Sequence, residues 1–188
     1  MTRKRALEIL KKYVENESLM KHSLAVEAGM LGYAKQLNED VERWGITGLV
    51  HDIDFEKYPE EHPLKGIEIL RQEGFDEDII YAVKGHANRT NTERKSNLDK
   101  ALYSVDELSS FIVACVLVRP SKSFDDLGVK SVKKKLKDKA FARAVNRDDI
   151  KEGAEEFGID LTQHIENMIE FLKDREKELQ EMGLSLIH

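Results

Sequence analysis

The sequence predicts an all-α protein that folds as a single domain over residues 1–188. Apolar residues recur every three or four positions along nearly the whole chain, and no stretch shows the strict alternation of a half-buried strand. The 3 prolines leave long stretches in which a helix can run without interruption. With 40% hydrophobic residues, a chain of this length can bury a substantial core within one domain.

Most of the predicted helices carry an apolar stripe. In the second helix, Leu19 and Val26 lie on the stripe, and His22 lies between them on the same face. Residues 87–97 are polar and predict a loop, which the most hydrophobic helix follows. The expected helices span residues 3–16, 17–37, 40–53, 61 or 63–74, 76–86, 98–118, 129–147, 149–157 and 161–182.

Composition narrows the class of protein. The net charge of −6 argues against nucleic acid as the main partner. No apolar run is long enough to span a bilayer, and the basic start continues into an amphipathic helix instead of a signal peptide. The single cysteine, Cys115, cannot form an internal disulfide and is expected in the core, which favours a cytoplasmic location.

The most informative motif is the doublet His51-Asp52 in the last turn of the third predicted helix. A doublet at a helix end can direct two adjacent side chains at one point, which neighbours within a helix do less easily. Asp106 lies on the apolar stripe of its helix, where a carboxylate needs a partner. The full set of candidate ligands is His22, His51, Asp52, His62, His86 and Asp106.

Imidazole and carboxylate ligands without thiolates suit divalent iron or manganese best, with nickel or cobalt as further options. We expect the first ion to be held by His22, His51, Asp52 and Asp106. The second would be held by His62, His86 and the other oxygen of Asp52, unless His62 contacts substrate instead. Two bridged ions activate a hydroxide for phosphoester hydrolysis, so no serine or cysteine nucleophile is needed.

These residues resemble the signature of the HD-domain superfamily of metal-dependent phosphohydrolases. That signature is an upstream His, a His-Asp doublet and a distant Asp, and it is matched in order by His22, His51, Asp52 and Asp106. His62, with Pro63 and Gly66 after it, and His86 look like the additional histidines of the two-metal branches. The resemblance covers residues 19–120 as an HD-type helical core, and residues 121–188 are expected to form a helical extension packed on it.

The chain also departs from the pattern of many two-metal members. Asp54 and Phe55 stand where those members have a glycine and a lysine that lies near the substrate. Asp54 and Lys57 are the substitutes that the sequence offers, and Asp54 is therefore grouped with Asp52 as a candidate catalytic residue. Ala87 follows His86 where members that cleave cyclic dinucleotides commonly have a second histidine, so that branch is not expected.

A phosphorylated substrate requires cations outside the metal ligands. Arg89 is the first choice, because it follows His86 by three residues on the polar loop. The other candidates for substrate binding are Lys57, Lys65 and Arg119. Residues 130–147 hold eight basic side chains against one acid, which suits a nucleotide or nucleic-acid surface. Helical spacing of Val129, Val132 and Leu136 favours an ordinary solvated face instead.

The sequence thus predicts a cytoplasmic phosphohydrolase that cleaves a small phosphoester, such as a nucleotide, with a metal-activated hydroxide. One alternative is a mixed-valence di-iron oxygenase on the same fold, and another is a non-catalytic nucleotide-binding signalling module. No role is assigned to His164 or His188, and the last helix either completes the core or pairs with a second copy in a homo-oligomer.

Overall fold

The computed structural model describes all 188 residues and confirms the all-α prediction. It contains nine α-helices, one short 3₁₀ helix and no strand. The helices are α1 (Arg3–Tyr13), α2 (Glu17–Leu37), α3 (Val41–Val50), α4 (Leu64–Gln72), α5 (Glu77–Gly85), η1 (Asn88–Thr90), α6 (Asn97–Leu117), α7 (Val129–Leu136), α8 (Arg147–Phe157) and α9 (Leu161–Glu181). None of them combines the length and apolar character that a membrane span requires.

Side-chain caps set most of the helix starts. Asn16 caps α2 by accepting a hydrogen bond from the backbone of Leu19, and α2 ends at Asn38, which adopts a left-handed conformation. Ser96 and Asp99 form a capping box at the start of α6. These two caps fix the ends of the two 21-residue helices that carry His22 and Asp106.

The expected helix over residues 129–147 is wrong, because α7 ends at Leu136 and turns occupy the segment before α8. Asn146 caps α8 by accepting from the backbone N–H groups of Asp148 and Asp149, so a new helix begins there. The Arg147 guanidinium donates to the carbonyl oxygens of Ala142 and Val145. In a continued helix these carbonyls would have accepted backbone hydrogen bonds instead. The end of the expected helix 40–53 is also wrong, since α3 stops at Val50.

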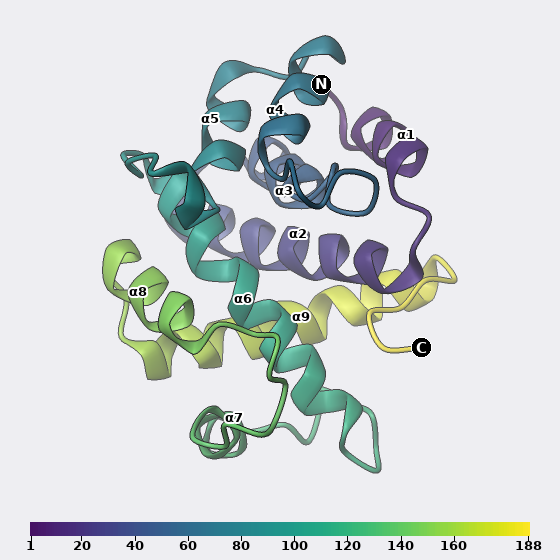
Figure 1. Ribbon diagram of the computed structural model, residues 1–188. Helices are drawn as coiled ribbons and strands as arrows, with labels where there is room; N and C mark the ends of the chain where they lie inside the picture. Colours follow the sequence, from purple (N-terminus) through teal and green to yellow (C-terminus); the bar gives the residue numbers. More distant parts are fainter.

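Helix α2 lies at the centre of the bundle and packs against α3, α6 and α9 (Figure 1). Helices α1, α4 and α5 lie on the α3 side of α2, and α8 packs against α6 (Figure 1). Helix α9 therefore contributes to the core, where Met168 and Leu172 are fully buried. The continuous core also includes Met30, Leu49, Leu102 and Phe111.

Close approach of α2 and α3 depends on Gly48. A Cβ atom at this position would lie 3.0 Å from backbone atoms of Glu27 in α2 and 2.9 Å from Cγ of Met30. Because His51 follows Gly48 by one helical turn, this contact sets how far His51 stands from His22 on α2.

We expect Gly48→Ala to destabilise the fold by about 1–3 kcal/mol, because α3 must move away from the α2 backbone. Urea unfolding measures the effect, and Gly128→Ala is the matched control, since no atom lies within 4 Å of a Cβ built there. Equal changes in the free energy of unfolding of the two variants would mean that α2 and α3 can move apart without loss of stability.

His164 is a buried core histidine. Its Nε2 donates to the carbonyl oxygen of Ser104 at 2.9 Å, and its Nδ1 accepts from the Tyr33 hydroxyl at 2.5 Å. Burial lowers the pKa of His164 from 6.5 to about 4. The imidazole is thus neutral in the folded protein at neutral pH.

This lowered pKa predicts a loss of stability in acid. The unfolded chain binds the proton below about pH 6.5, whereas the folded chain resists it, so the stabilisation present above pH 6.5 is lost as the pH falls toward 4. Urea unfolding of wild type and His164→Gln at pH 7 and pH 4.5 tests this. The variant should be less stable at pH 7 yet should lose less stability between the two pH values. A drop in the variant as large as that of the wild type would assign the acid sensitivity to other groups.

Candidate metal centre

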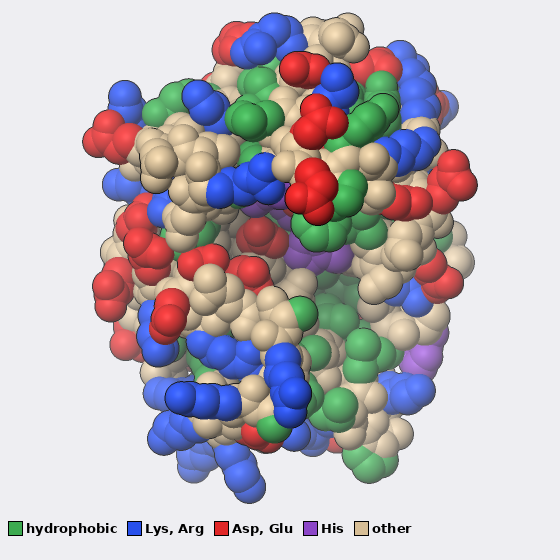
Figure 2. Space-filling model, in the orientation of Figure 1, with side chains coloured by type: hydrophobic (Ala, Val, Ile, Leu, Met, Phe, Trp, Pro, Cys, Tyr) green, Lys and Arg blue, Asp and Glu red, His purple; other side chains and the backbone are tan.

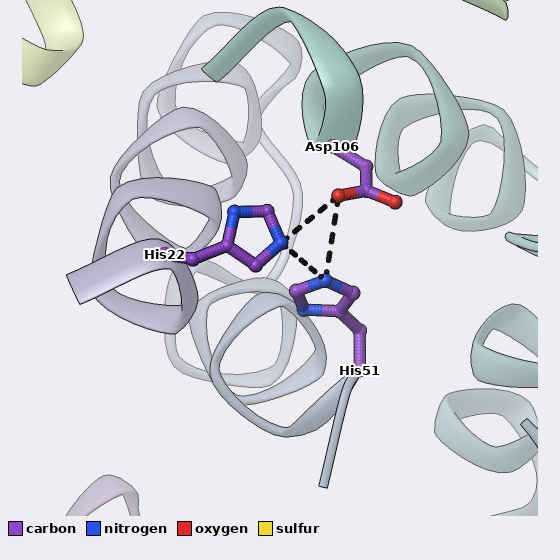
Figure 3. A group of neighbouring side chains, drawn as sticks. All are labelled: His22, His51 and Asp106. Atoms are coloured by element: carbon purple, nitrogen blue, oxygen red, sulfur yellow. Dashed lines mark hydrogen bonds and ion pairs between the residues drawn. The ribbon is translucent and has the colours of Figure 1, made fainter. Parts of the chain in front are cut away.

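The structure brings all six predicted ligands together, although they come from five parts of the chain. His22 lies on α2, Asp106 on α6, and His51 immediately follows α3. The Nε2 atom of His22 lies 3.1 Å from Nε2 of His51 and 3.1 Å from Oδ1 of Asp106, and Nε2 of His51 lies 3.4 Å from the same oxygen (Figure 3). Three atoms that can each offer a lone pair to a metal ion thus face the same small space.

The two carboxylate oxygens of Asp52 face different histidines. Oδ2 lies 3.6 Å from Nε2 of His22 and 3.4 Å from Nε2 of His51. Oδ1 lies 3.4 Å from Nε2 of His86 and 3.6 Å from Nε2 of His62. One carboxylate therefore separates a group containing His22 and His51 from a group containing His62 and His86.

Every histidine of the cluster is held through its Nδ1 atom, which leaves Nε2 facing inward. His51 donates to the Gly48 carbonyl at 2.8 Å, His86 donates to the Val83 carbonyl, and His62 donates to the Asp54 carboxylate at 2.8 Å. In His22 the Nδ1 atom is paired with the hydroxyl of Ser110 at 2.9 Å. A neutral imidazole with its proton on Nδ1 has its lone pair on Nε2, the form that binds a metal ion.

The electrostatics of the cluster favour a cation. Burial lowers the pKa of His51, but the negative charges of Asp52 and Asp106 outweigh it and hold that pKa well above the usual value. Burial alone would raise the pKa values of Asp52 and Asp106, yet His51 and the neighbouring histidines keep both well below the usual range. Both carboxylates are thus ionised at neutral pH, and a divalent ion would compete with protons for this site.

The sequence model of one known family, described as HD domain, matches residues 19–110. The matched range contains all six ligand candidates. Residues 19–110 are an HD domain. The HD-domain superfamily, which this segment matches, consists generally of hydrolases that bind divalent metal ions.

The HD domain opens to solvent through a cleft of about 480 Å³ that is lined by His22, His62 and His86. Figure 2 shows this hollow, with histidine side chains inside it. Its mouth is lined by Phe55, Asn88, Arg89, Tyr103, Glu107 and Asp149. The cleft combines one guanidinium with two carboxyls outside the ligand set.

The structure places only one of the four predicted substrate-binding cations in the lining of this cleft. Arg89 lines it and donates to the Glu60 carbonyl at 2.7 Å. Lys57 instead donates to the Lys12 carbonyl at 2.7 Å. Lys65 and Arg119 pair with carboxylates of Glu68 and Asp126, respectively, and neither lines the cleft.

Asp54 has a different place from the one that the sequence suggested. Its side chain is fully buried, with Oδ1 accepting from His62 and Oδ2 accepting from the backbone N–H of Gly66 at 2.6 Å. Asp54 therefore positions His62 and does not face the cleft. A Cβ at Gly66 would lie 3.1 Å from this carboxylate, so the glycine makes room for Asp54.

Two residues near the ligands were not predicted. Ser110 holds His22, and its position one helical turn after Asp106 was the signal that could have identified it. Glu107 lines the cleft, and burial together with the charge of Asp106 raises its pKa to about 7. No pattern of the sequence separates Glu107 from the other acids of the chain, because its pKa depends on burial.

Proposed function

We propose that this HD domain is a binuclear metal centre that hydrolyses a small phosphoester. The observation that carries the proposal is the position of Asp52, whose two oxygens face two separate groups of imidazoles at 3.4–3.6 Å. A carboxylate in this position can bridge two ions. The first ion would be held by His22, His51, Asp52 and Asp106, and the second by Asp52, His62 and His86.

The donor set fits such ions. Four imidazole nitrogens and two carboxylates, without a thiolate, suit divalent iron or manganese. When bound, a pair of divalent ions lowers the pKa of water toward neutrality and offsets the negative charge of a phosphate. The protein supplies fixed ligand directions, because each Nδ1 atom is already hydrogen-bonded.

The cleft supports a small substrate with little negative charge beyond the reacting phosphate. A volume of about 480 Å³ lies in the range of small-molecule sites. Arg89 can bind a phosphate oxygen, whereas Asp149 would repel additional phosphates, and both Glu107 and Asp149 can accept hydrogen bonds from hydroxyl or amino groups. We therefore favour a phosphomonoester of a polar molecule, such as a nucleoside monophosphate.

The test is hydrolysis by protein reloaded with Mn²⁺ or Fe²⁺ under anaerobic conditions, followed as phosphate release from the monoesters and as p-nitrophenol release from the diester. The panel contains p-nitrophenyl phosphate, bis(p-nitrophenyl) phosphate and nucleoside 5′-monophosphates. We expect turnover that stops when EDTA removes the metal. In a parallel aerobic assay, substrate-dependent oxygen uptake without hydrolysis would instead identify the di-iron oxygenase. Tight nucleotide binding without any turnover would identify a binding module.

A further inference from the structure

The basic segment between α7 and α8 contrasts with the rest of this acidic protein. The whole chain has a net charge of −6, yet residues 130–147 contain eight Lys and Arg and one acid. Figure 2 shows blue side chains gathered around α7 and the segment that follows it. The helical spacing of Val129, Val132 and Leu136, which favours an ordinary solvated face, covers α7 alone, and the basic residues after Leu136 lie outside that helix.

Where the helix ends, the chain encloses a second cleft of about 930 Å³, larger than the cleft above the metal ligands. The two clefts have no lining residue in common. The second cleft is lined by α7, the turns after it, the first turn of α8 and the start of α9. It is thus a separate cavity and not an extension of the metal centre.

The lining combines apolar side chains with cations that have no partner in the fold. An apolar wall of the cleft is formed by the half-buried or buried side chains of Leu136, Val145 and Ile150. Arg147 is occupied by backbone carbonyls. In contrast, the side chains of the exposed residues Lys137, Lys139 and Arg143 make no hydrogen bond or ion pair with the protein. Three unpaired positive charges at the rim of an apolar cavity are typical of a site for an amphipathic anion.

We propose that this cleft binds a nucleoside di- or triphosphate, with the phosphates on Lys137, Lys139 and Arg143 and the nucleoside against the apolar wall. The volume fits one nucleotide. The lining has no Phe, Tyr or Trp on which successive bases could stack, so a single-stranded nucleic acid is the less suitable occupant.

The experiment is calorimetric titration of the 188-residue protein freed of metal with EDTA, so that binding does not depend on the metal centre or on hydrolysis. The probes are ATP, AMP and inorganic tripolyphosphate. The test variant is Lys137→Gln/Lys139→Gln/Arg143→Gln. The matched control is Lys4→Gln/Lys11→Gln/Lys177→Gln, which removes the same charge from exposed positions outside this cleft. Circular dichroism verifies that both variants are folded.

We expect ATP to bind more tightly than AMP, because it brings more phosphates, and more tightly than tripolyphosphate, because it also covers the apolar wall. ATP affinity should fall at least tenfold in the test variant, less than twofold in the control, and steadily with added NaCl. Equal weakening in both variants, or no binding of ATP at 1 mM, would overturn the proposal. Displacement of ATP by a single-stranded 12-mer at lower concentration would also overturn it and identify a nucleic-acid surface.

Discussion

Asp52→Asn is expected to remove both ions from the metal centre and to lower phosphoester hydrolysis by about a thousandfold or more. The amide has one oxygen and no charge, so it cannot bridge the two groups of histidines that the carboxylate faces. A thousandfold loss corresponds to about 4 kcal/mol of transition-state stabilisation, within what a bound metal ion supplies.

The measurement is metal content per chain together with the initial rate on the best phosphoester of the panel. Asp174→Asn is the matched control, because it makes the same chemical change at an exposed carboxylate of α9. Retention of two ions and of more than a tenth of the rate in Asp52→Asn would contradict the bridging role.

Asp54→Ala is expected to weaken the second ion selectively. Asp54 orients His62 through its Nδ1 atom, and loss of such a partner typically lowers metal affinity about 10–100-fold. The first group of ligands does not contact Asp54, so one ion should remain. Metal titrations at limiting and at stoichiometric metal concentration would measure the affinities of the two sites separately.

The conservative variant Asp54→Asn distinguishes positioning from direct proton transfer. Its side-chain oxygen can still accept from His62, so it should retain more of the second ion than Asp54→Ala. If both variants bind two ions with unchanged affinity while kcat falls, Asp54 would act on the substrate, as the sequence first suggested.

The grouping of the six candidate ligands was predictable because helical periodicity and residue type carry it. His22 and Asp106 lie on apolar faces of long helices, and such faces turn inward in any bundle. The doublet His51-Asp52 at the end of α3 could then be assigned to the same group without knowledge of the tertiary structure. The bounds of α2 agree fully with the prediction, because Asn16 and Asn38 are strong local signals.

The roles of Asp54 and of the candidate cations could not be predicted in the same way. Asp54 meets His62 only because the turns after α3 fold back on themselves, a contact that no spacing rule describes. Lys57 and Lys65 have long, flexible side chains, and nearby carbonyl or carboxylate groups decide where they point. The break between α7 and α8 depends on Arg147 binding backbone carbonyls several residues earlier in the chain.

The most direct test of a binuclear centre is elemental analysis of protein purified without chelators or an affinity metal column. The geometry of Asp52 predicts close to two equivalents of iron or manganese per chain, falling to none in Asp52→Asn. One equivalent, with His62 and His86 replaceable by alanine without loss of metal, would contradict the second ion. No metal, even after reloading with divalent ions, would contradict the metal centre as a whole.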